Sequence, residues 1–186
     1  MEQGLHPTHF LVIGLASVKE ILKMLESIEG ERYVVVYPNP ESFRKVYSQH
    51  AKRQIENNGM VIMLPYYETT DRARAALNHA GIDVRAQEGS GFLVIMDSYA
   101  AFLGFKQDNE LFFSRLVSHA IVSKKSGICI IADMGAFFLI DRVAEIAAGR
   151  VKVRGFCTYH QRDFEKLSEG QRKAVFGQGY RALFVQ

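Results

Sequence analysis

The sequence predicts an α/β domain of three layers, in which a largely parallel β-sheet carries helices on both faces. Apolar runs of strand length recur along the chain, at Val34–Tyr37, Met60–Leu64, Phe92–Met96 and Ile128–Ala132. Segments with apolar residues at helical spacing separate these runs. A strand that is apolar along its whole length belongs to a sheet buried on both faces, and such sheets are mostly parallel.

The N-terminal residues 1–30 are interpreted as a strand and helix that extend the main domain, which spans residues 31–186. His9–Ile13 is a short apolar run, and Ser17 is expected to cap a helix. One face of that helix carries Val18, Ile21, Leu22, Leu25 and Ile28, and Glu29-Gly30 ends it. The helix either packs on the main sheet or contacts a second subunit.

The next elements follow from capping and turn residues. Asn39 and Pro40 favour the start of a helix that includes Phe43–Asn58. Thr69-Thr70 precedes a helix over residues 71–80, which Gly81 ends. The triplet Ile82–Val84 is expected to be a short strand, and Phe92–Met96 a buried one that ends at Asp97.

Alternating helices and strands complete the chain. Helices are expected around residues 111–123, 136–148 and 163–175. Ile128–Ala132 is a buried strand followed by Asp133, and residues 182–185 form the last strand. Residues 151–159 alternate between apolar and polar side chains, which predicts a strand nearer the edge of the sheet.

Length, composition and charge indicate one soluble globular domain. The chain has 186 residues, 48% apolar and 23% charged, with a formal net charge of +3. This basic excess is too small to indicate binding to nucleic acid or to a membrane. No apolar run reaches the roughly 20 residues that span a bilayer, and no signal peptide is evident. Cys129 and Cys157 lie in apolar runs and are expected to be buried free thiols, so we expect a cytoplasmic protein.

The turn after the first central strand does not have the composition of a phosphate-binding loop. Such loops are rich in glycine, because glycine lets backbone N–H groups close around phosphate oxygens. Here the turn is Pro38–Ser42, without glycine and without a Lys-Ser/Thr pair. Glu41 adds a carboxylate at the position of a phosphate. A nucleotide-binding scaffold with this turn has lost or exchanged its ligand.

Ligands bind beyond the carboxyl ends of the strands in this class of fold, so the residues after the apolar runs are candidate ligand contacts. These candidates are Tyr37, Asn39, Glu41, Arg44, Tyr66, Tyr67, Asp97, Asp133 and Phe137. Each also has a structural interpretation. In the structural interpretation, the first four residues do no more than begin a helix. The two tyrosines then pack on the sheet edge or on another subunit. Each aspartate could accept bonds from neighbouring backbone, and Phe137 could be an ordinary core residue.

The sequence supports neither a metal site nor a nucleophilic one. Cys157 and His160 are three residues apart, but the second ligand pair of a zinc site is missing. Asp97 and Asp133 end strands as a magnesium-binding aspartate does, but the Lys-Ser/Thr part of that site is missing. No Gly-x-Ser-x-Gly motif occurs, so hydrolysis has no support in the sequence and no cofactor is expected.

Several short motifs recur in order over residues 31–185, namely Tyr33–Glu41, Gly59–Tyr66, Ala80–Val84, Gly91–Asp97, Ala132–Gly135 and Gly155–His160. With these motifs the chain resembles the MEDS family of sensory domains (methanogen/methylotroph, DcmR-type). The resemblance implies a RecA/KaiC-like core without a Walker A loop. It also implies a sensory or regulatory role, with recognition of a small, hydrocarbon-like compound.

Three functions therefore remain open. The first is a non-catalytic sensory domain that binds a small molecule, forms a homo-oligomer and signals through a separate partner, such as a kinase or a transcription regulator. The second is a nucleotide-binding protein with an atypical phosphate site. The third is a protein-interaction module.

Overall fold

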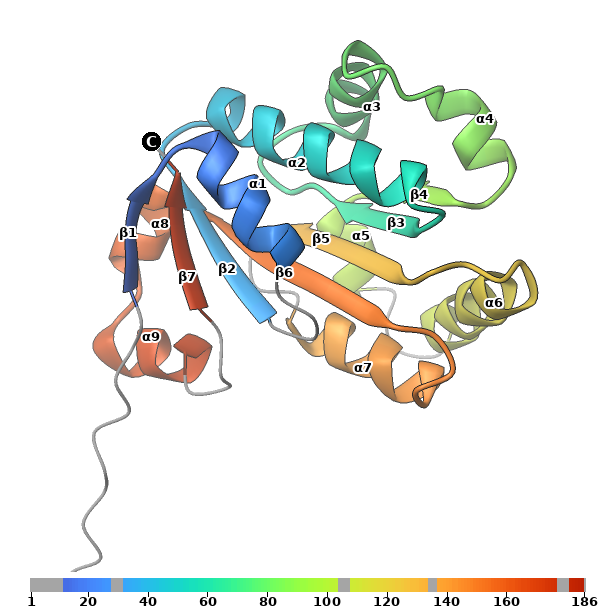
Figure 1. The fold of residues 1–186 in the computed structure, drawn as a ribbon. Coiled ribbons are helices and arrows are strands. Elements are labelled where there is room, and N and C mark those ends of the chain that lie inside the picture. The colour runs from blue at the N-terminus through green and yellow to red at the C-terminus, as the bar shows by residue number, and fades with distance from the viewer. Residues whose placement is uncertain (1–11, 28–31, 104–107, 134–136, 177–180, 186) are drawn as a thin grey trace, which may run out of the picture.

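The computed structural model describes residues 12–27, 32–103, 108–133, 137–176 and 181–185. Within these residues the strands form one seven-stranded sheet in the order β1-β7-β2-β6-β5-β3-β4 (Figure 1). Every pairing in it is parallel, which confirms the α/β fold class. The strands are β1 Val12–Ala16, β2 Arg32–Tyr37, β3 Met60–Leu64, β4 Leu93–Ile95, β5 Ile128–Asp133, β6 Val153–His160 and β7 Arg181–Val185.

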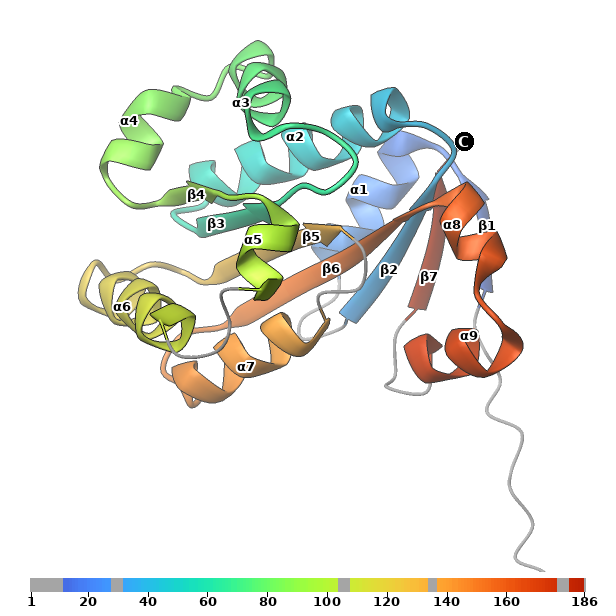
Figure 2. The same ribbon diagram turned by 180° about the vertical axis from the view of Figure 1, so that it is seen from behind.

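Helices cover both faces of the sheet, as Figure 1 and, from behind, Figure 2 show. One face carries α1 Val18–Ser27, α2 Pro40–Glu56 and α3 Thr70–His79, with α4 Val84–Gly89 beside α3. The other face carries α5 Ser98–Leu103, α6 Asp108–Val122, α7 Phe137–Ala147, α8 Gln161–Lys166 and α9 Glu169–Phe176. The predicted three layers are therefore present.

The central strands contribute side chains to both layers of core. In β3, Val61 and Met63 join the core beneath α2, whereas Met60, Ile62 and Leu64 join the core beneath α6 and α7. All five residues of β3 are buried. This is why the strand has no polar position: its successive side chains point to opposite faces, and both faces are covered.

Side-chain caps start the helices at the expected residues. The side chain of Asn39 accepts a hydrogen bond from the Ser42 N–H at 2.9 Å, and Pro40 is the first residue of α2. Ser17 and Glu20 exchange reciprocal bonds at the start of α1, with the Glu20 carboxylate accepting from the Ser17 N–H at 2.8 Å. Such bonds satisfy N–H groups that have no partner within the helix.

The described part of the N-terminal extension packs on its own chain. β1 is the edge strand and pairs with β7, and α1 lies against α2. The side chain of Ile21 is fully buried in the core, and Leu25 is 6% exposed. For residues 12–27, α1 therefore covers the main sheet. Residues 1–11 and 28–31, which include Ile28 and Glu29-Gly30, lie outside the described residues.

Three sequence-based assignments were wrong. The first concerns residues 82–84, which were expected to form a strand. Asp83 instead caps α4, because its side chain accepts a hydrogen bond from the Ala86 N–H at 3.0 Å. A three-residue apolar triplet carries too little periodicity to compete with such a cap.

The second wrong assignment is the place of β6, which lies at the centre of the sheet, between β2 and β5. Its alternation does not come from a solvated face. Arg154 lies near its start, Gly155 leaves room for Ile140, and the polar Thr158 is fully buried and bonded to Asp133.

The third wrong assignment is a single helix over residues 163–175. The structure has two helices, because Leu167 is extended and ends α8. Ser168 and Gln171 then cap α9 reciprocally, with the Gln171 amide oxygen 2.8 Å from the Ser168 nitrogen and the Ser168 hydroxyl accepting from the Gln171 N–H. This is a capping box with glutamine as the second partner.

Candidate functional site

The carboxyl ends of the parallel strands bring four segments of the chain to one edge of the sheet. The chain leaves β2 and β3 toward α2 and α3 on one face, and it leaves β5 and β6 toward α7 and α8 on the other face (Figure 1, Figure 2). Open α/β sheets bind ligands at the carboxyl ends of their strands, where connections diverge to opposite faces. Residues at these strand ends form the candidate site.

Asp133, the last residue of β5, is the polar centre of this edge. Its carboxylate accepts hydrogen bonds from the Thr158 hydroxyl, from the Tyr66 N–H at 2.8 Å, from the Tyr67 N–H at 3.4 Å and from the Tyr37 hydroxyl at 3.4 Å. Asp133 is 5% exposed. Burial raises its pKa, and the bonds from Thr158 and the two N–H groups act in the opposite direction. The carboxylate thus joins the ends of β2, β5 and β6 to the loop after β3.

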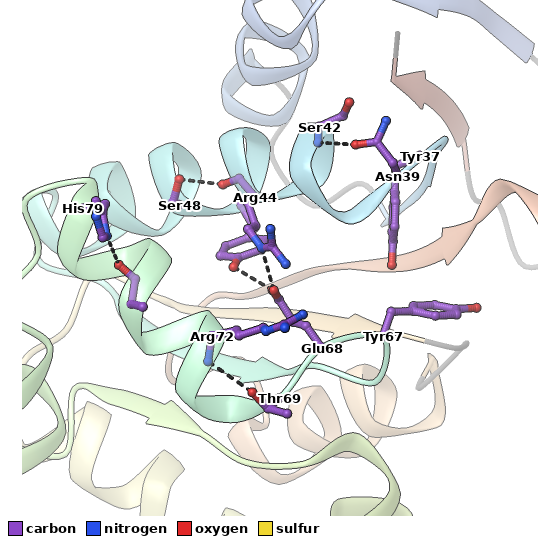
Figure 3. A network of polar contacts seen from close by, with 12 residues as sticks. Tyr37, Asn39, Ser42, Arg44, Ser48, Tyr67, Glu68, Thr69, Arg72 and His79 are labelled. Atoms are coloured by element: carbon purple, nitrogen blue, oxygen red, sulfur yellow. Dashed lines mark hydrogen bonds and ion pairs between the residues drawn. The ribbon is translucent and has the colours of Figure 1, made fainter.

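Aromatic rings pack around this carboxylate. Tyr37 is 1% exposed and stacks on Phe43 with ring centroids 4.4 Å apart. Tyr67 meets the Tyr37 ring edge-on at 6.0 Å and lies 5.7 Å from the His160 ring (Figure 3 shows Tyr37 and Tyr67). Tyr66 packs edge-on against Tyr67 at 5.1 Å, and it is 48% exposed. The exposed Tyr66 ring therefore packs on Tyr67, whose own ring contacts Tyr37 and His160.

The Tyr37 and Tyr67 hydroxyls are held in the neutral form, because their pKa values are raised. Burial and the nearby charge of Asp133 raise the pKa of Tyr37. Burial and a hydrogen bond to Asp163 raise the pKa of Tyr67, and the same bond lowers the pKa of Asp163. A neutral phenol offers a ring face and a single donor, and it is a poor base. Tyr37 and Tyr67 therefore present ring faces and hydroxyl donors at this edge.

Glu68 attaches the same loop to α2. The Arg44 Nε and the Tyr47 hydroxyl each donate to its carboxylate, both at 2.7 Å, as Figure 3 shows. Its side chain is 6% exposed, whereas that of Arg44 is 32% exposed. The loop that carries Tyr66 and Tyr67 is thus fixed on one side by Asp133 and on the other by Arg44.

The structure brings together some of the residues singled out from the sequence. Tyr37, Tyr66, Tyr67 and Asp133 lie together, and Arg44 reaches them through Glu68. The rings of Tyr37, Tyr66 and Tyr67 pack against one another, and Tyr66 is the most exposed of the three.

The remaining candidates are Asn39, Glu41, Asp97 and Phe137. Asn39 caps α2, and Glu41 is an exposed residue in the first turn of the same helix. Asp97 precedes α5 and accepts a hydrogen bond from the Ala100 N–H at 2.9 Å, so it serves as a cap. Phe137 is the first residue of α7, and its side chain lies outside the described part of the chain.

Sequence reasoning missed Glu68, Thr158 and His160 as members of the site. The stretch Cys157–His160 was tested only for metal ligands and nucleophiles. In the sheet, Thr158 is the register partner of Asp133, so the two side chains meet across neighbouring strands. The sequence did carry one signal for Thr158, because it is a polar residue among the apolar residues at the end of a strand.

The turn before α2 offers little to a phosphate group. Pro40 has no N–H, and the Ser42 N–H is already bonded to the side chain of Asn39. A phosphate at the start of a helix binds to the free backbone N–H groups of its first turn, and neither of these two positions offers one. Among the described residues, no group of three or more His, Cys, Asp and Glu side chains could hold a metal ion. No helix of the described chain is long and apolar enough to cross a membrane.

Comparison with known proteins adds no assignment. A scan against models of protein families finds no match to this chain. A search of curated proteins finds no relative.

Proposed function

We propose that this chain is a non-catalytic regulatory domain that binds a small planar or apolar ligand at the carboxyl edge of its sheet. The observation that carries the proposal is that the Asp133 carboxylate is hydrogen-bonded by the chain itself. Its two carboxylate oxygens accept four hydrogen bonds from the chain itself, two of them from the N–H groups of Tyr66 and Tyr67. A carboxylate engaged in this way positions an aromatic loop and is not free to act as a base or as a metal ligand.

The platform formed by Tyr66 and Tyr67 supports a preference for flat or apolar ligands. Tyr66 has the exposed ring, and Tyr67 holds it from beneath at 5.1 Å. A ring that is already fixed loses little conformational freedom when a ligand stacks on it, which favours binding. The resemblance to MEDS sensory domains supports the same class of ligand. In such a role the domain would report ligand binding to a separate partner.

The test begins with native mass spectrometry of freshly purified protein, to identify co-purified compounds. Toluene and indole then serve as apolar and planar probes, because a ligand that binds only the folded state raises the midpoint of thermal unfolding. We expect Tyr66→Ala to weaken probe binding by about 1–3 kcal/mol. The matched control is Tyr99→Ala, since Tyr99 is also an exposed tyrosine, 61% exposed on α5.

Two outcomes would reject the proposal. Equal losses of probe binding in Tyr66→Ala and Tyr99→Ala would show that Tyr66 and Tyr67 do not form the binding site. Magnesium-dependent hydrolysis of ATP or GTP that disappears in Asp133→Asn would instead favour the nucleotide-binding alternative.

A further inference from the structure

A wide groove lies between α2 and α3, on the outer side of the helices that cover the sheet. It encloses about 1050 Å³ and is open to solvent. Its α2 wall runs from Glu41 to Lys52, and its α3 wall runs from Arg72 to Ala80. Figure 3 shows Arg44 and Ser48 on one wall, with Arg72 and His79 on the other. The aromatic cluster is not part of this lining.

The groove is positively charged. Four cations line it, Arg44, Lys45, Lys52 and Arg72, against one carboxylate, Glu41. The exposed Lys45 and Arg72 have no ion-pair partner in the described part of the chain. Lys52 is 4.0 Å from Glu56, and both side chains are well exposed, so this pair holds Lys52 weakly. Three of the four cations are therefore available to an incoming anion.

The Arg44 charge is used within the domain. Its Nε donates to the buried carboxylate of Glu68 at 2.7 Å, and this bond raises the pKa of the guanidinium. Arg44 is thus held in the wall by Glu68, while Lys45 from α2 and Arg72 from α3 line the groove as exposed cations. Opposed cations on two rigid helices form a site for carboxylates spaced along a chain.

The shape of the groove favours a peptide over a small molecule. Its α3 side carries Ala75, Ala76 and Ala80, and these short side chains let a partner backbone approach the helix. The α2 wall is about 16 Å long at 1.5 Å of rise per residue. A small molecule in a well-formed site buries roughly 70–90% of its surface, which a groove open along its length does not provide.

We propose that the groove between α2 and α3 binds an acidic segment of a partner protein. Carboxylates of the segment pair with Lys45 and Lys52 from α2 and with Arg72 from α3, while its backbone lies over the alanines. Such pairs at an exposed surface contribute to the rate and specificity of association, and they weaken as salt screens them. This inference is independent of the ligand proposed for the aromatic edge.

The test uses the full chain and a fluorescein-labelled peptide of alternating glutamate and alanine, about five residues long, because an extended chain of that length spans the roughly 16 Å of the α2 wall. Fluorescence anisotropy at low ionic strength should show saturable binding that weakens as salt is added. The double variant Lys45→Glu/Arg72→Glu should bind at least about tenfold more weakly. A peptide of alternating glutamine and alanine should not bind.

The matched control is Arg115→Glu/Arg162→Glu, which makes the same change in net charge at exposed residues of α6 and α8, on the opposite face. We expect this control to bind within about twofold of the unaltered chain. Equal loss in both double variants would mean general charge attraction and would overturn the site, as would the absence of saturable binding. Displacement of the peptide by a single-stranded oligothymidine at lower concentration would identify a nucleic-acid surface and overturn the proposal as well.

Discussion

His50 shows how burial sets the protonation of a single residue in this domain. It lies on α2, is 4% exposed, and has its Nε2 atom 3.4 Å from the Cys129 sulfur, while its Nδ1 atom has no partner among the described residues. Burial, with the nearby charge of Arg154, lowers the pKa of His50 to about 4. Burial raises the pKa of Cys129 to about 12. At neutral pH both groups are uncharged, so the contact is structural and the thiol is not an activated nucleophile.

The low pKa of His50 predicts loss of stability in acid. The imidazole has a pKa near 6.5 in the unfolded chain and about 4 in the folded one, so the unfolded state binds more protons between these values. Stability should therefore fall as the pH drops from about 6.5 to about 4, by roughly 3 kcal/mol from this residue. Urea unfolding at a series of pH values measures this loss.

His50→Phe is the control for that measurement, because it keeps a ring beside Phe156 and removes the titrating group. Its stability should depend less on pH over the same range. Asp133 acts in the opposite direction, since burial raises its folded pKa and its protonation favours the folded state in acid. A variant as acid-sensitive as the unaltered chain would show that His50 does not carry the effect.

At the scale of elements, β6 depends on a glycine for its place in the sheet. A Cβ atom at Gly155 would lie 2.6 Å from the Ile140 Cδ1 atom and 3.0 Å from the Ile130 backbone oxygen. Gly155→Ala should therefore lower the free energy of unfolding by about 1–3 kcal/mol, because the Ile140 side chain, or α7 that carries it, must move away from the strand.

Gly170→Ala is the matched control for Gly155→Ala. Gly170 lies in α9, and nothing stands within 4 Å of the position of its Cβ. Alanine there should raise stability by about 0.5–1 kcal/mol, because glycine is a poor helix former. Chemical denaturation compares the two changes. Destabilisation by both to the same degree would contradict the packing explanation.

The elements also show which features of the fold could be predicted from the sequence. The apolar run at β3 was predicted to the residue, since a strand buried on both faces has no polar position. The alternation in β6 was misread as an edge signal, because its polar residues have partners from elsewhere, as Thr158 has in Asp133. For the site too, part could be predicted from the sequence and part depends on packing between distant segments. That Tyr37 meets the Tyr66–Tyr67 loop follows from parallel strands, but the contact of Glu68 with Arg44 depends on how α2 lies against that loop.

At the scale of the whole molecule, α1 tests whether the N-terminal extension belongs to the domain or to an assembly. Ile21, on the inner side of α1, is fully buried. Ile21→Ala should lower the free energy of unfolding by about 2–5 kcal/mol, as in other core truncations. If α1 packs on its own chain, this loss is the same at every protein concentration. A loss that grows on dilution, measured together with sedimentation, would place the helix in an interface and support the expected homo-oligomer.

The strand order also determines when this protein can fold. β2 lies in the middle of the sheet, yet its two neighbours are β6 and β7. During synthesis Tyr33 has no strand partner until Phe156 has emerged, and its second partner is Arg181. The nascent chain therefore carries an apolar, unpaired strand while most of its length is made, which slows folding and exposes it to aggregation. Fragments that stop before β6 should collapse without forming the sheet, and the domain should complete its structure only after release of its last strands from the ribosome.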